Sequence, residues 1–172
     1  HQWRQIQARV EAANQSGLTM KLQTAARGIG VINSLNASFH PFIGFPRYKT
    51  LAHLPLAERA ARMRDPEIKA RILSETSEKL AGDGSSVPPL VDILLAQIEL
   101  LAARLFPLGD DLNYEPQLTE SFLAQAKQRG IRPIEVLYDY LAEGDGTNLI
   151  YFPIFNYGPG SLDVVAEMMK HP

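Results

Sequence analysis

Cysteine is absent from this sequence of 172 residues, and the absence removes several kinds of chemistry at once. Without a thiol, the chain can form no disulfide, offer no thiolate nucleophile and hold no zinc through sulfur. Because disulfides belong mainly to secreted proteins, their absence favours an intracellular, cytoplasmic setting.

An excess of charge of one sign is also lacking. Seventeen lysines and arginines stand against nineteen aspartates and glutamates, which gives a formal net charge of −2. The basic residues between positions 59 and 71 are interleaved with acidic ones and are expected to form a solvated face. The balance therefore argues against nucleic acid as a partner.

No apolar run is long enough to cross a membrane. The longest, residues 90–106, is interrupted by Asp92, Gln97, Glu99 and Arg104. A membrane-spanning helix needs about 20 consecutive apolar residues, so we expect no membrane partner. A helix this apolar is expected to be buried, either by its own fold or by a partner protein.

Histidines are few and scattered. The four lie at positions 1, 40, 53 and 171, with no His-x-His pair and no pair spaced four apart. A metal site needs three or four converging ligands, so this chain is expected to contain none of its own.

Hydrophobic periodicity predicts alternating helices and strands. Alternation of Leu18, Met20 and Leu22 with polar residues predicts a strand at 18–25, and a second strand is expected at 149–154. Helices are expected at 3–16, 55–63, from 66, at 90–106, from Thr119 to 129, at 133–143 and from Ser161. A turn-rich linker is expected at 81–89.

This order predicts an α/β fold, with the two strands parallel and belonging to a partial (β/α)8 barrel with a large, mostly helical insertion. The expected division is residues 1–26 as barrel helix and strand, 27–132 as insertion and long loop, and 133–172 as barrel helix, strand and helix. Two parallel strands make a poor sheet, so we expect the chain to be an internal piece whose other strands come from the rest of a longer polypeptide or from other chains.

Residues after the predicted strands are candidates for a binding pocket, because α/β proteins place such groups at strand C-termini. Arg27 continues the inward row of the first strand and could hold a substrate carboxylate, or form a structural salt bridge. Lys21, in the same row, is expected to be a paired structural group.

Three further pocket candidates lie in the loops. His40 is either a substrate-binding or acid/base group, or a histidine packed between Phe39 and Phe42. Tyr48 lies later in the same long loop. Asn156 follows the second strand and could bind substrate, or simply form a turn.

Several runs of residues resemble one branch of the amidohydrolase superfamily, the D-aminoacylase or N-acyl-D-amino-acid deacylase branch. They are Arg27-Gly28-Ile29-Gly30, His40-Pro41-Phe42, Pro46-Arg47-Tyr48, Leu54-Pro55-Leu56-Ala57-Glu58-Arg59, Phe106-Pro107-Leu108-Gly109-Asp110, Tyr114-Glu115-Pro116 and Phe155-Asn156-Tyr157.

The resemblance implies a metal-dependent hydrolase of C–N amide bonds in small N-acyl (D-)amino acids, built on a (β/α)8 barrel. It also implies zinc or a similar divalent metal, held by an early His-x-His and further ligands that have no counterpart here. No catalytic residue and no metal ligand is assigned to this chain, which is expected to be inactive alone. The alternative is a non-catalytic helical module that docks a partner through residues 90–106.

Overall fold

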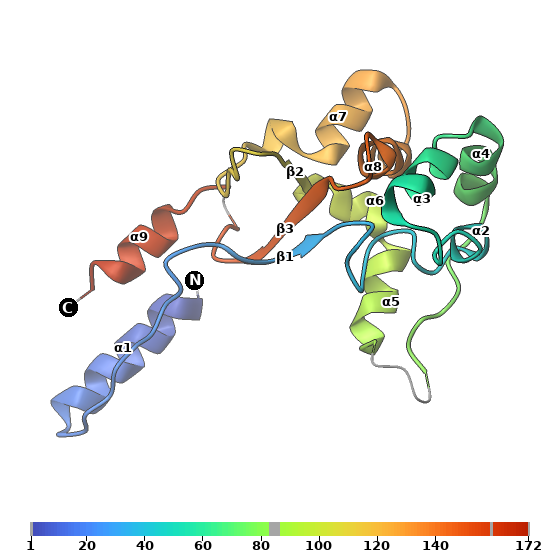
Figure 1. The fold of residues 1–172 in the computed structure, drawn as a ribbon. Coiled ribbons are helices and arrows are strands. Elements are labelled where there is room, and N and C mark those ends of the chain that lie inside the picture. The colour runs from blue at the N-terminus through green and yellow to red at the C-terminus, as the bar shows by residue number, and fades with distance from the viewer. Residues whose placement is uncertain (1, 83–86, 159, 172) are drawn as a thin grey trace.

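The computed structural model describes residues 2–82, 87–158 and 160–171, which combine helices with a small sheet (Figure 1). The helices are α1 (Gln2–Gln15), α2 (Pro46–Lys49), α3 (Leu56–Met63), α4 (Pro66–Ser74), α5 (Pro89–Ala96), α6 (Ile98–Leu101), η1 (Ala102–Arg104), η2 (Leu118–Glu120), α7 (Phe122–Arg129), α8 (Pro133–Ala142) and α9 (Asp163–Met169). The strands are β1 (Ile29–Asn33), β2 (Phe106–Leu108) and β3 (Leu149–Phe155). The general α/β expectation is confirmed.

The sheet is built around β3. Its order is β1-β3-β2, and both neighbours run antiparallel to β3. Ile29 pairs with Phe155 at one end of β1, and Asn33 pairs with Ile150 at the other. The predicted second strand is thus confirmed, but the parallel arrangement is wrong for the described residues, whose three strands form no barrel.

The predicted strand at 18–25 is also wrong. These residues take no regular structure, and no described strand pairs with them. Leu18 is 60% exposed, and Met20 and Leu22 are exposed as well. An alternating pattern forms a strand only where a neighbouring strand pairs with its backbone. Residues 18–25 have no such neighbour in the described structure, whereas Ile29 pairs with Phe155, so the first strand begins at Ile29.

A hydrophobic core lies between the helices α2, α3, α4, α7 and α8 and one face of β3. It contains aromatic and aliphatic side chains from segments far apart in the sequence: Leu35, Phe42, Tyr48, Met63, Ile72, Phe122, Tyr138, Leu137, Leu141 and Ile150. The Tyr138 hydroxyl donates a hydrogen bond to the Met63 carbonyl oxygen at 2.9 Å, so its one polar group is satisfied inside the core.

Local capping chemistry explains several helix boundaries. The Asp65 side chain accepts hydrogen bonds from the backbone of Glu67 and Ile68, and Pro66 occupies the first turn, as predicted for α4. Helix α7 ends at Gly130, whose φ of 67° is the left-handed value that glycine adopts easily. Its N-cap is Ser121 rather than Thr119, which lies in η2.

The predicted apolar helix at 90–106 is interrupted. Gln97, with φ of −115° and ψ of 23°, separates α5 from α6, and the segment ends in η1 and β2. Leu95, Ala102 and Leu105 are buried by the chain's own fold. The opposite side remains open, because Leu100 is 71% exposed.

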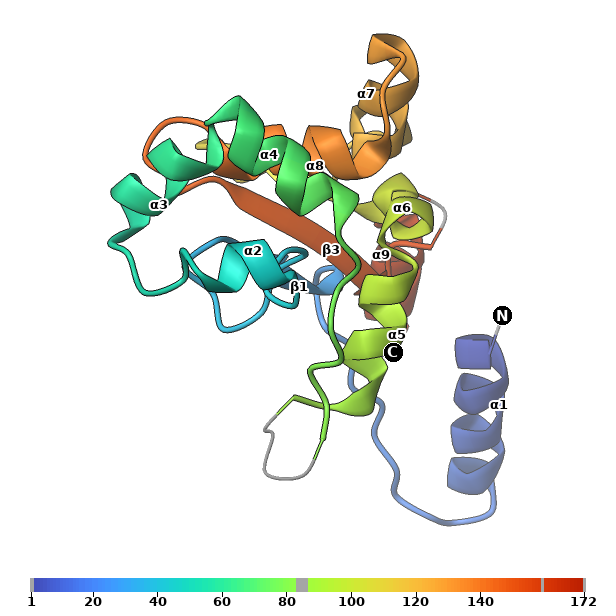
Figure 2. The ribbon, with the colours of Figure 1, turned by 90° about the vertical axis from the view of Figure 1, so that its right-hand side faces the viewer.

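Helix α1 stands apart from the helical body (Figures 1 and 2). None of its residues is buried. It contacts the C-terminal segment through an ion pair of Arg4 with Glu167 at 2.6 Å and a hydrogen-bonded contact of His171 with Glu11 at 2.6 Å. Helices α1 and α9 were both predicted, although α9 begins at Asp163 and not directly after Ser161.

Residues 83–86, in the middle of the predicted linker 81–89, lie outside the described residues. In the part of the chain that the structure covers, none of the helices combines the length and apolar character needed to span a lipid bilayer.

The core predicts a large difference between two leucine truncations. We expect Leu137→Ala to lower the free energy of unfolding by about 2–5 kcal/mol, because Leu137 is 0% exposed and its removal leaves a cavity. Leu100→Ala, a matched control at a largely exposed helical leucine, is expected to change it by about 0.5 kcal/mol or less. Urea unfolding followed by circular dichroism measures both, and equal losses would contradict this core.

Candidate functional site

Arg27 and Asn156 lie side by side at one end of the sheet. Arg27 comes just before β1, and Asn156 comes just after β3, at the end where Ile29 pairs with Phe155. The Asn156 side-chain amide donates to the Arg27 carbonyl oxygen at 3.5 Å. Asn156 has φ of 63°, a left-handed conformation that asparagine tolerates better than most residues. Antiparallel pairing thus brings two predicted site residues together.

The Arg27 guanidinium is exposed and has no charged partner among the described residues. It makes no hydrogen bond or ion pair with any residue in the described ranges. The alternative expectation for Arg27 was a structural salt bridge. No acidic side chain in the described ranges forms one with it. A cation with free donors at a strand end can receive an anionic ligand.

Tyr151, which the sequence analysis did not select, lies beside this pair. Its hydroxyl is buried and has no hydrogen-bond partner in the described residues. A side chain on Gly28 would place its Cβ 2.6 Å from that hydroxyl, so glycine is required for the close approach. The Tyr114 ring meets Tyr151 edge-on, with centroids 5.3 Å apart.

The Tyr151 hydroxyl is a neutral donor. Burial raises its pKa, the neighbouring Tyr114 raises it further, and the positive charge of Arg27 opposes the rise. The sequence signal that could have identified Tyr151 is a tyrosine within an otherwise apolar strand, because a buried hydroxyl ordinarily needs an acceptor. Arg27 and Asn156 supply donors at this end of the sheet, whereas the Tyr151 hydroxyl is buried against Gly28.

His40 and Tyr48 form a separate pair beyond the other end of β1. The His40 ring packs edge-on against Tyr48, with centroids 4.7 Å apart. Its Nδ1 accepts a hydrogen bond from the Phe42 backbone N–H at 3.2 Å. The Tyr48 hydroxyl accepts one from Arg59 at 2.9 Å, and Arg59 also donates to the Leu35 carbonyl oxygen. Both side chains are buried within the core.

Electrostatics keep His40 uncharged. Burial and, to a smaller extent, the positive charge of the neighbouring Arg59 together lower its pKa to about 3. Burial also raises the pKa of Tyr48, which the hydrogen bond from Arg59 partly offsets. A neutral histidine that caps a backbone N–H in this way orders its loop. The packing agrees with the structural alternative for His40, with Tyr48 as its ring partner.

The four predicted site residues therefore occupy two places. Arg27 and Asn156 lie at the start of β1, whereas His40 and Tyr48 lie past its end, in the buried body. Within the described residues, no group of three or more histidine, aspartate or glutamate side chains is placed to hold a metal ion.

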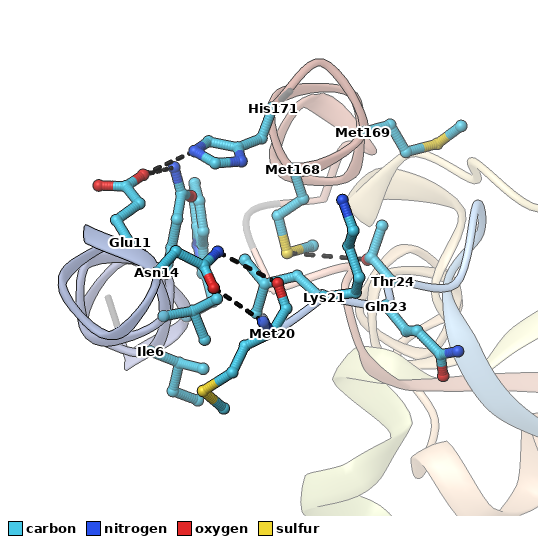
Figure 3. A pocket seen from close by; sticks show the side chains of 14 residues that line it. Ile6, Glu11, Asn14, Met20, Lys21, Gln23, Thr24, Met168, Met169 and His171 are labelled. Atoms are coloured by element: carbon cyan, nitrogen blue, oxygen red, sulfur yellow. Dashed lines mark hydrogen bonds and ion pairs between the residues drawn. The ribbon is translucent and has the colours of Figure 1, made fainter. Parts of the chain in front are cut away.

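A groove of about 520 Å³ lies between α1, residues 20–24 and α9 (Figure 3). Its lining combines apolar side chains, including Ile6, Met20 and Met168, with polar ones, including Glu11 and His171, which contact each other at 2.6 Å. The Asn14 side chain holds one wall in place, since it accepts from the Met20 N–H at 2.7 Å and donates to the Met20 carbonyl oxygen at 3.1 Å.

Comparisons of the chain with models of protein families, with curated proteins and with solved structures find no match.

The pKa of His40 predicts how stability depends on pH. Because the folded-state pKa is about 3 and the ordinary value is 6.5, the unfolded chain binds a proton between these pH values that the folded chain does not. Stability is therefore lost as pH falls below 6.5, by up to about 1.4 kcal/mol per pH unit. Denaturant unfolding at a series of pH values measures this slope.

We expect His40→Gln to flatten the slope and His53→Gln, at an exposed histidine, to leave it unchanged. An identical slope in wild type and His40→Gln would show that another group causes the acid sensitivity.

Proposed function

We propose that this chain is an internal segment of a metal-dependent amidohydrolase that hydrolyses C–N amide bonds of N-acyl (D-)amino acids. The family-like runs, which extend from Arg27 to Tyr157, support this proposal. The lack of cysteine supports a cytoplasmic setting for such an enzyme. Zinc or a similar ion, with its ligands, would come from polypeptide outside these residues, so the chain alone is inactive.

The observation that carries the proposal is the free guanidinium of Arg27 beside Tyr151 and Asn156. An N-acyl amino acid presents a carboxylate close to the amide bond that is cleaved. Arginine binds a carboxylate through two parallel hydrogen bonds, which fixes both its position and its orientation. In our proposal Arg27 binds this carboxylate, and the amide of Asn156 adds a further donor.

We further propose that the chain contributes to a (β/α)8 barrel completed by other segments. The helix–strand–helix order of α8, β3 and α9 supports this idea. So do the open outer edge of β1 and the exposed side chains of Leu18, Met20 and Leu22. A barrel has no open edge, so the missing strands would have to close it.

The role of Arg27 is tested in the intact enzyme that contains this chain. We expect Arg27→Gln to raise KM for N-acetyl amino acids by about 10- to 100-fold, because a charge-assisted bond to the substrate is lost. Arg9→Gln, at an exposed arginine of α1, is the matched control and should leave KM unchanged. The substrate analogue with a carboxamide in place of the carboxylate should be insensitive to both substitutions.

The proposal fails if the intact protein contains no divalent metal and hydrolyses no N-acyl amino acid. It also fails in its residue assignment if Arg27→Gln affects carboxylate and carboxamide substrates equally.

A second candidate function rests on the exposed side of α5 and α6. Leu90, Ile93 and Leu100 are 60%, 58% and 71% exposed, while the opposite side is buried. Exposed apolar side chains gathered on neighbouring helical turns are typical of protein-docking surfaces. The chain would then be a non-catalytic module that binds a partner through this surface.

Solution mass tests the docking module. We expect a module of this kind to be a well-behaved monomer that unfolds cooperatively. Ile93→Glu should weaken its binding to the partner at least about tenfold, because a buried apolar contact is replaced by a charge. Ile154→Glu, at an exposed isoleucine outside this surface, is the control. Aggregation of the isolated chain would favour the enzyme segment instead.

A further inference from the structure

The groove between α1, residues 20–24 and α9 contains apolar side chains that remain partly open to water. Ile6, Met20 and Leu22 line it and are between 43% and 48% exposed. Its volume of about 520 Å³ lies within the range that is usual for small-molecule pockets. A ligand with an apolar body would cover these side chains, and removing apolar surface from water favours binding.

Methionines contribute to two walls of the groove. Met20 lies in the segment that follows α1, whereas Met168 and Met169 lie at the end of α9. The Met168 sulfur accepts a contact from the Thr24 hydroxyl at 3.7 Å, which joins the two walls (Figure 3). Methionine side chains are flexible and polarisable, so they can adapt to the shape of an occupant. The groove therefore suits a flexible apolar chain.

The carboxylate in the lining already has partners. Glu11 accepts a hydrogen bond from the Gln7 amide at 3.1 Å and contacts His171 at 2.6 Å. The Asn14 amide is also engaged, since it bonds both backbone groups of Met20. A cationic ligand would therefore find no unpaired carboxylate among the described residues of the lining.

Lys21 is a lining residue whose charge is not balanced. It is exposed and forms no ion pair with the described residues, so the pairing expected from the sequence is not formed there. Figure 3 shows its side chain extending toward α9. The hydrocarbon stem of a lysine adds apolar surface, and its ammonium group attracts an anion. Charge therefore favours a ligand with a carboxylate.

We propose that this groove binds a small carboxylate with a flexible apolar chain, of the class of medium-chain fatty acids. The chain of the ligand lies against Ile6, Met20 and Met168, and its carboxylate pairs with the ammonium group of Lys21. The walls all come from this chain, so no segment from elsewhere is needed to form the site. The site does not depend on the amidohydrolase proposal, because it uses neither Arg27 nor a metal.

The methionines allow the site to be tested on the complete chain with an internal control. Three of the four line the groove, whereas Met63 is buried in the core. Octanoate is the probe, and NMR follows the methionine methyl groups after labelling with carbon-13. We expect the three groove resonances to shift with saturation and that of Met63 to stay. Octan-1-ol, which lacks the carboxylate, should bind about two- to fivefold more weakly.

Two pairs of variants locate the binding. Lys21→Met should weaken octanoate to the level of octan-1-ol and leave octan-1-ol unchanged, whereas Lys127→Met, at an exposed lysine of α7, should affect neither. Ile6→Glu places a charge in the groove and should weaken both ligands at least about tenfold. Ile93→Glu, at an exposed isoleucine of α5, is its control. Circular dichroism confirms that each variant is folded.

Three results would overturn the proposal: no shift of the groove methionines, an equal shift of all four methionines, or equal affinity for octanoate and octan-1-ol. Shifts that appear without ligand and grow with protein concentration would also overturn it, because a second copy of the chain would then occupy the groove. None of these results depends on catalytic activity, so they are independent of the test of Arg27.

Discussion

Pairing of β3 with a strand on each side is the constraint on which the rest of the structure depends. It joins Ile29–Asn33 to residues more than a hundred positions later and brings β2 to the opposite edge. Arg27 and Asn156 meet only because the ends of β1 and β3 meet. In the same strand, Ile150 packs in the core and the Tyr151 hydroxyl lies close to Gly28. The register of β3 therefore determines both the core packing and the candidate site.

The two ends of β1 differ in their electrostatics. Past its end, His40 is buried, neutral and engaged with Phe42 and Tyr48, and the positive charge of Arg59 is held by carbonyl and hydroxyl oxygens. Before its start, Arg27 is exposed, and within the residues that the structure describes neither its charge nor the nearby buried hydroxyl of Tyr151 has a partner. The first environment restrains a loop, and the second is suited to receiving an anion.

Local signals made the helices predictable. Asp65 with Pro66, and Gly130 after a helical pattern, act over a few residues, so α4 begins and α7 ends where those residues stand. Strands depend on distant partners, which explains why β1 and β2 were missed and why 18–25 was predicted wrongly. Arg27 was selected as the continuation of the wrongly predicted strand 18–25, and Asn156 because it follows the strand that became β3. Tyr151 was missed because its importance follows from the position of Gly28, which only the tertiary structure reveals.

Helix α1 has no buried residue, and its ion pairs with the C-terminal segment are on the surface. Dissolved salt screens such pairs over distances of about 8–10 Å, whereas it scarcely weakens an apolar core. An isolated helix of this length is only marginally stable in water. Ionic strength therefore acts selectively on this molecule: a concentrated salt solution loosens α1 from α9 and exposes both walls of the groove while the helical body persists.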